Sequence, residues 1–268
     1  MWKELDLKEI QDIQYEMLCV FDDYCKKHHL KYYLDSGTLL GAIRHQDFIP
    51  WDDDMDTGMP RPDYDKFLEV AREDKLADDI LVGALEYGNL EYPFLKLFRT
   101  DTKVYIKNTD ETGGKHIWID VFPLDGLPSD EKENRKIHKQ NRFLGRLHGG
   151  TKTRLSNEKN GVKKIGKFFA STLLKLYGGK RISEKMMRNA RRYDYHTAER
   201  EGNLTWGGIQ GNKVKEYEHP MVTKTFRGRE FPVHPRWEEW LTNMYGEYLK
   251  LPPLEKRTGH GYQAWKWE

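Results

Sequence analysis

The chain has 268 residues, of which 37% are hydrophobic and 33% are charged, and its formal net charge at pH 7 is +2. This length allows one large or two small domains, and the high charge predicts a heavily solvated surface. No run approaches the roughly 18 apolar residues that a membrane-spanning helix needs, and the first residues lack the apolar core of a signal peptide. Cys19 and Cys25, the only cysteines, point apart on a predicted helix, which favours a reducing, cytoplasmic setting.

Charge is distributed unevenly along the chain. Residues 134–192 contain 18 lysines and arginines but only two acidic residues, a net charge of +16. Such a split usually indicates a partner of opposite charge, either nucleic acid or an anionic membrane surface.

Hydrophobic periodicity, capping residues and turn residues predict the secondary structure. In chain order we expect a helix over 3–29, a strand over 30–36, a short helix over 38–44 capped by Ser36 or Thr38, a strand over 48–59, a helix over 63–71, strands over 80–87, 94–99, 103–107 and 117–122, a helix-rich stretch over 130–200, strands within 219–233 and a helix over 235–250.

A phosphate-binding turn is one interpretation of the point where the 30–36 strand ends. Ser36, Gly37 and Thr38 stand between this strand and the next helix, and the first turn of a helix leaves N–H groups that attract phosphate. Gly37 would allow close approach, and Arg44 would add a charged fork. An ordinary strand-to-helix turn with an N-terminal cap explains the same residues.

Residues 51–56, Trp-Asp-Asp-Asp-Met-Asp, hold four carboxylates within five positions. Each pair of such charges costs about 1 kcal/mol at 4 Å in water and more where water is scarce. In an extended strand Asp52, Asp54 and Asp56 share one face, and we expect the Asp54–Asp56 pair to bind Mg²⁺ or Mn²⁺. A solvated acidic loop is the alternative. A calcium loop of the EF-hand type is excluded, because Thr57 occupies the position that requires glycine.

Asp120 is the only acidic residue in the apolar run His-Ile-Trp-Ile-Asp-Val-Phe. Burying a carboxylate in such a strand costs free energy unless a cation or a hydrogen-bond donor pairs with it. A salt-bridged structural aspartate is one explanation. Together with the acidic run, Asp120 indicates a third metal ligand or a general base for phosphoryl transfer.

Together, the Ser36-Gly37-Thr38 turn, the acidic run and Asp120 resemble the motifs of the polymerase-β-like nucleotidyltransferase superfamily. More specifically, the sequence resembles the LicD family, relatives of fukutin and of bacterial phosphocholine transferases. The resemblance is carried by residues 35–67, 92–100, 118–128 and 237–257, and it is weak over 134–215. It implies an α+β fold, namely a nucleotidyltransferase-like mixed β-sheet flanked by helices, with a helix-rich basic insertion.

The resemblance also implies a domain division and an activity. A catalytic core would span 1–133, a basic helical insertion 134–200, and strands and a helix over 201–268 would complete the core. We expect Mg²⁺- or Mn²⁺-dependent transfer of phosphocholine, or a similar phospho-substituent, from a CDP-linked donor to a hydroxyl of a cell-surface glycan or teichoic-acid precursor, with release of CMP. An enzyme that transfers the nucleotide itself, or a nucleic-acid-binding protein that uses 134–192, is the alternative.

Residue roles are carried over by position from this resemblance. Asp54, Asp56 and Asp120 would bind the metal and carry catalysis, whereas the roles of Asp52 and Asp53 are open. The residues expected to contact the substrate are Ser36, Gly37, Thr38 and Arg44 at the donor phosphates and Lys96 and Arg99 at the departing CMP. A surface lysine is an equal alternative for Lys96.

Two further expectations concern partners. A CDP-choline donor would need an aromatic cage, for which Trp51, Trp118, Tyr87 and Tyr92 are candidates, whereas CDP-ribitol or CDP-glycerol would need none. Residues 162–177 predict a basic amphipathic helix, which either packs on the core or docks peripherally on an anionic membrane that carries a lipid-linked saccharide acceptor. We expect no nucleic-acid partner, because the basic stretch lacks interleaved aromatic residues in a reading motif.

Overall fold

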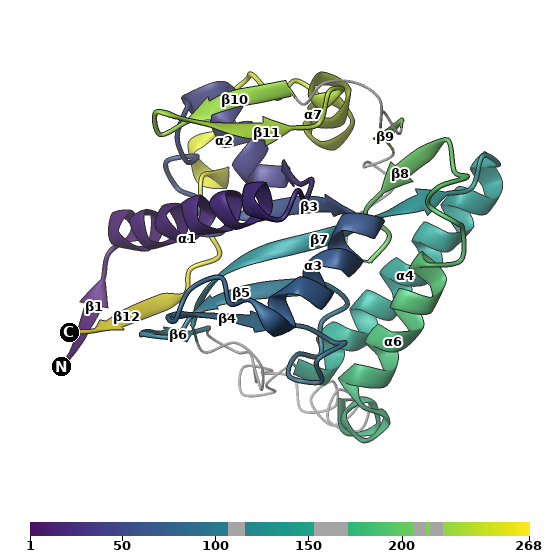
Figure 1. Ribbon diagram of the computed structural model, residues 1–268, viewed down its shortest axis with the longest axis horizontal. Helices are drawn as coiled ribbons and strands as arrows, with labels where there is room; N and C mark the ends of the chain where they lie inside the picture. Colours follow the sequence, from purple (N-terminus) through teal and green to yellow (C-terminus); the bar gives the residue numbers. More distant parts are fainter. Residues whose placement is uncertain (107–115, 153–170, 206–212, 215–221) are drawn as a thin grey trace.

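The computed structural model of the protein describes residues 1–106, 116–152, 171–205, 213–214 and 222–268 (Figure 1). Its helices are α1 (Leu7–Lys27), α2 (Ser36–His45), α3 (Arg61–Glu73), α4 (Glu131–Lys152), α6 (Gly179–Ala190), α7 (Trp237–Tyr245) and the short 3₁₀ helix η2 (Leu254–Lys256). Its strands are β1 (Trp2–Leu5), β2 (Tyr33–Leu34), β3 (Asp56–Pro60), β4 (Ile80–Gly83), β5 (Leu95–Arg99), β6 (Thr102–Tyr105), β7 (Ile117–Leu127), β8 (Arg200–Gly202), β9 (Lys213–Val214), β10 (Val222–Phe226), β11 (Arg229–Val233) and β12 (Gln263–Trp267).

A mixed sheet forms the centre of the described part. Its strand order is β2-β3-β7-β5-β4, and β8 and β9 continue from the end of β7. β3 runs parallel to β7, whereas the other pairings are antiparallel. Helices α1 and α3 cover one face of this sheet, and α4 and α6 pack together near the end of β7 (Figure 1). The predicted α+β fold, a mixed sheet flanked by helices, is confirmed.

The face of the sheet beneath α1 and α3 is apolar. Leu95 and Leu97 of β5 lie opposite Val121 and Ile119 of β7, and all four are fully buried in one cluster with Met17 of α1. Since side chains alternate along a strand, the intervening residues of β5 and β7 point to the opposite face. That second face carries the polar side chains described below.

Helix α1 begins later than its apolar spacing predicts. Residues 2–5, expected in part to be helical, form β1, which pairs with β12. The helix starts at a capping box, in which the Glu9 N–H donates to Asp6 Oδ1 at 2.8 Å and the Asp6 N–H donates to Glu9 Oε2 at 2.9 Å. The cap explains why the helix does not extend toward residue 3.

Replacing Asp6 with alanine should lower the free energy of unfolding by about 1 kcal/mol, because one orphan N–H of the first turn loses its acceptor. Urea unfolding measures this difference. Glu4→Ala, an exposed position in β1, is the control and should be neutral. Equal destabilisation by both variants would contradict the cap's role.

Two expected strands have different bounds. The strand expected over 48–59 is confined to β3, because the chain turns before it, with the Asp52 N–H donating to the Ile49 carbonyl at 2.9 Å. The strand expected to end before Pro123 continues to Leu127 as part of β7. Proline lacks a backbone N–H, but it is tolerated at this position. The pairing of β7 with β5 ends at Val121 and its pairing with β8 begins at Asp125, so no described strand lies beside Pro123 on that side to accept a hydrogen bond from it.

Strand β12, which periodicity did not predict, joins distant parts of the chain. It lies between β1 and β6 in a three-stranded sheet, and the first and last described residues lie side by side (Figure 1). The residues just before β12 are thereby held beside the acidic run.

The predicted amphipathic helix over 162–177 lies mostly outside the described residues. In the part that is described, Leu173 and Leu176 are exposed. Among the described helices, none combines the length and the apolar character that crossing a membrane would require.

Candidate active site

Three charged side chains form a row across the middle of the central sheet. Asp56, the first residue of β3, lies directly opposite Asp120 of β7, and Lys96 of β5 lies opposite Asp120 on its other side. Residues opposite each other in a sheet project from the same face. Lys96 Nζ lies 2.7 Å from Asp120 Oδ1, and both residues are less than 10% exposed. The structure therefore brings together two of the predicted metal ligands, and it places a buried ammonium beside them.

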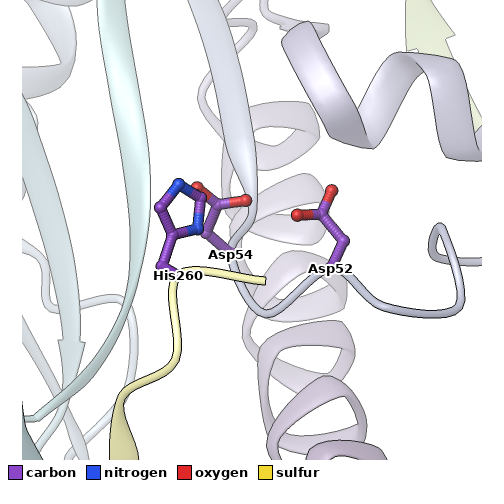
Figure 2. A group of neighbouring side chains, drawn as sticks. All are labelled: Asp52, Asp54 and His260. Carbon is purple, nitrogen blue, oxygen red and sulfur yellow. The ribbon is translucent and has the colours of Figure 1, made fainter. Parts of the chain in front are cut away.

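The other carboxylates lie on the loop that precedes β3 rather than on one strand face. Ligand atoms of Asp52, Asp54 and His260 all lie within 4.8 Å of one another, and Figure 2 shows the imidazole of His260 beside the Asp54 carboxylate. Helix α1 fixes this loop, since Gln11 Nε2 donates to the Asp52 carbonyl at 2.8 Å. Asp54 lies two residues before the first residue of β3, and its negative charge helps to raise the pKa of Asp56.

Burial, with repulsion between neighbouring carboxylates added to it, raises the pKa values of Asp52, Asp56 and Asp120. Burial and the neighbouring Asp54 raise the pKa of Asp52 to about 8. Burial, followed by Asp54 and Asp120, holds the pKa of Asp56 well above its ordinary value. Burial also raises the pKa of Asp120, although Lys96 opposes this shift. The site thus contains more negative charge than its own side chains neutralise.

This donor set fits a hard divalent cation. Carboxylate oxygens are the ligands that Mg²⁺ and Mn²⁺ prefer, and a nearby cation favours the ionised carboxylates and so opposes both the burial and the repulsion that raise these pKa values. Asp56 and Asp120 carry the two facing carboxyls, and Asp54 extends the set from the loop.

Comparison with known proteins gives the context of this site. The family model described as "LicD/FKTN/FKRP, nucleotidyltransferase domain" matches residues 29–148. The lipopolysaccharide cholinephosphotransferase LicD of Haemophilus influenzae is 32% identical over 277 residues, which cover 97% of this chain and 98% of that protein. This chain belongs to the LicD family. The prediction that the protein is a LicD-type phosphotransferase is confirmed by the family match and by this full-length relative.

More distant relatives agree. An uncharacterized protein of Rickettsia typhi, RT0683, is 38% identical over 137 residues, which cover 51% of this chain and 40% of that protein. The human ribitol 5-phosphate transferase FKRP is 57% identical over 30 residues, which cover 11% of this chain and 6% of that protein. The short match to FKRP supports the predicted relationship of the LicD family to fukutin.

The turn that the LicD resemblance assigns to donor phosphates has a different cap from the one expected. Asp35, not Ser36 or Thr38, caps α2, since its Oδ1 accepts the Ser36 N–H at 2.8 Å. Trp240 Nε1 also donates to this oxygen at 2.5 Å. The Thr38 hydroxyl accepts the Asp56 N–H at 2.9 Å and so fixes the start of β3. Thr38 therefore has a structural contact in addition to any role toward substrate.

Gly37 makes room for the Asp52 carboxylate. A Cβ at this position would lie 2.5 Å from Asp52 Oδ2, closer than side chains tolerate. Gly37→Ala should therefore displace Asp52 and lower the transfer rate by about 10-fold or more, since small misplacements at a reacting site are costly. Steady-state kinetics measure this loss. Gly145→Ala in α4, where a Cβ would meet only Met186 at 3.7 Å, is the control that should retain full activity.

The two predicted substrate-binding arginines lie in different places. Arg44 donates from Nη1 to the Tyr248 carbonyl at 2.9 Å, on the segment that follows α7. Arg99 is an odd number of residues from Lys96 along β5 and so projects from the opposite face. It pairs there with Asp79 and Glu16. The structure therefore does not bring Arg99 to the face of the sheet that carries Asp56 and Asp120.

The four candidate cage aromatics do not form one cage. The Lys96 ammonium already lies 4.5 Å from the ring centre of Trp118 and 5.1 Å from that of Tyr92. Trp51 stacks under Arg257, with 5.3 Å between guanidinium carbon and ring centre. The Tyr87 hydroxyl donates to the Leu68 carbonyl within α3, and the Arg72 guanidinium lies over the Tyr87 ring.

Sequence reasoning missed the segment that carries His260. This residue is 207 positions from Asp53, which it contacts, and no periodicity or charge pattern links the two. A glycine on either side of His260 was the only local sign of a special backbone.

Proposed function

We propose that the protein is a Mg²⁺- or Mn²⁺-dependent transferase that moves phosphocholine, or a similar phospho-substituent, from a CDP-linked donor to a saccharide hydroxyl and releases CMP. The row of Asp56, Asp120 and Lys96 across three adjacent strands is the observation that carries the proposal. Similarity over nearly the whole chain to a lipopolysaccharide cholinephosphotransferase supports phosphocholine as the group and a cell-surface glycan as the acceptor, and we include a teichoic-acid precursor in the proposal as an alternative acceptor.

The proposed chemistry assigns the acidic residues two tasks. A divalent cation held by Asp54, Asp56 and Asp120 would supply positive charge to the phosphate that is transferred. Asp120 receives the proton of the acceptor hydroxyl, whose oxygen bonds to phosphorus while the bond between phosphorus and the CMP oxygen breaks. Lys96, 2.7 Å from Asp120, favours the ionised form that can take this proton.

We place the donor phosphates at the start of α2. Gly37 and Thr38 lie in its first turn, where helical N–H groups attract anions, and Ser36 and Arg44 of α2 complete the proposed contacts. Because Arg99 lies on the other face of the sheet, we leave it out of this group. Lys96 is assigned to Asp120 rather than to the departing CMP, since its ammonium already contacts that carboxylate.

CMP release from CDP-choline, in the presence of Mg²⁺ and a glycan acceptor, tests this function. Mass spectrometry of the acceptor should show the gain of phosphocholine. A gain of the nucleotide would instead support the second candidate, a nucleotidyltransferase, and CDP-ribitol and CDP-glycerol test the other substituents. Absence of CMP with all three donors and with Mn²⁺ as well as Mg²⁺ would reject the proposal.

We also propose a cytoplasmic location with peripheral binding at the inner face of the membrane through residues 162–177. The net charge of +16 over 134–192 supports attraction to an anionic bilayer. Sedimentation with anionic vesicles tests this binding, and salt-sensitive binding to generic DNA or RNA would favour a nucleic-acid partner instead.

A further inference from the structure

Asp53 stands between Asp52 and Asp54 in sequence, but its carboxylate is already fully engaged by the protein. Oδ1 accepts the His260 N–H at 2.8 Å and lies 2.9 Å from His260 Nδ1, and Oδ2 accepts the Gly261 N–H at 2.9 Å. Asp53 is only 5% exposed. These partners leave little of this carboxylate to bind a cation.

The segment that binds Asp53, residues 259–262, is shaped to fit it, and we call it the C-terminal clasp. A Cβ on Gly259 would lie 2.9 Å from the Asp53 carboxylate and 2.7 Å from the Trp51 carbonyl. Gly261 has φ +71°, which glycine adopts without strain. The Tyr262 hydroxyl donates to the Asp53 carbonyl at 2.5 Å. All four residues of the clasp thus contact or closely approach Asp53.

The clasp is anchored in the fold and reaches the adjacent carboxylate. It continues directly into β12, which is paired on both sides, with β1 and β6. His260 Nδ1 also lies 3.4 Å from Asp54 Oδ2 (Figure 2). Because Asp52 and Asp54 flank Asp53, fixing the Asp53 carboxylate restricts the backbone from which both neighbours project.

We infer that Asp53 is a positioning residue, through which the C-terminal clasp holds Asp54, with Asp52 beside it, in the geometry from which Asp54 binds the divalent cation. The inference rests on the proposed metal-dependent function and extends it to residues near the other end of the chain. Partners that orient metal ligands typically change metal affinity by about 10- to 100-fold when they are removed.

Mn²⁺ binding, measured by electron paramagnetic resonance or calorimetry on the full chain, tests the inference without any turnover. Asp53→Asn should weaken Mn²⁺ binding by about 10-fold or more, because an amide cannot accept bonds on both sides. The matched control is Asp22→Asn. Asp22 is also buried, but it is paired with Lys26 and Arg229, neither of which belongs to the acidic loop or to the clasp, so its loss should lower the melting temperature but leave Mn²⁺ affinity unchanged.

A pair of glycine variants keeps the test decisive if Asp53→Asn fails to fold. Gly261→Ala and Gly228→Ala both place a Cβ in open space at similar backbone angles, φ +71° and +77°. Only the first belongs to the clasp, so only the first should weaken Mn²⁺ binding.

Unchanged Mn²⁺ affinity in both Asp53→Asn and Gly261→Ala would overturn the inference while leaving the proposed function intact. Absence of Mn²⁺ binding by the wild-type protein would overturn both the inference and the metal-dependent function.

Discussion

Replacing Asp56 with asparagine should lower the kcat of transfer by about 100- to 1,000-fold and should at the same time stabilise the metal-free protein. The loss of activity follows because Asp56 is the residue that faces Asp120 across β3 and β7. The gain in stability follows because burial, Asp54 and Asp120 hold the pKa of Asp56 well above its ordinary value, so folding must either bury an unfavourable charge or take up a proton, and a neutral isostere avoids both costs.

These opposite effects are measured by CMP release and by urea unfolding in the presence of EDTA. Asp78→Asn, an exposed acid in the loop before β4, is the control and should change neither quantity. A variant of Asp56 that is both inactive and less stable without metal would indicate a structural role, and one that retains activity would remove Asp56 from the site.

The metal-free protein should lose stability as pH rises from about 5 to about 8. Burial and Asp54 raise the pKa of Asp52 from 3.8 to about 8, so the folded state holds a proton that the unfolded state has already released. The hydrogen bond with Asp53 raises the pKa of His260 from 6.5 to about 9, with the same consequence at higher pH. The stability that these two protons contribute is fully present below pH 3.8. It is lost as pH rises to the folded-state pKa values of about 8 for Asp52 and about 9 for His260.

Urea unfolding with EDTA across this pH range measures the slope. The double variant Asp52→Asn, Asp56→Asn should give a flatter profile. Addition of Mg²⁺ should stabilise the wild-type protein more at pH 8 than at lower pH, because cation binding displaces protons. Identical slopes for the wild type and the double variant would show that other groups control the dependence.

The acidic residues were recognisable from sequence because their chemistry is local. Four carboxylates near Trp51 and one acid in an apolar strand are unusual wherever they occur, and the LicD resemblance supplied their grouping. The register that places Asp56 opposite Asp120 depends on a parallel pairing between residues 64 positions apart, which no local pattern encodes. Lys96 was identified as a charged position, but its contact with Asp120 required the strand order.

The elements that were missed depend on long-range contacts. β12 is a short strand whose partners are β1 and β6, so its pairing is decided by packing rather than by propensity. β7 passes through Pro123 because a neighbouring strand is absent on one side there, which sequence does not reveal. The division at residues 133 and 200, and the identity of the cation, stay predictions.

The separation of Asp56 and Asp120 along the chain has a kinetic consequence. In the unfolded chain 63 residues keep these charges apart, and their repulsion arises only when β3 and β7 have paired. Non-local pairings form late in folding, so a cation that bridges the two carboxyls would act chiefly on the completed structure. Such a cation would slow the opening of the sheet far more than it would hasten its assembly, and the protein's lifetime in the native state would therefore depend on the supply of free divalent ions.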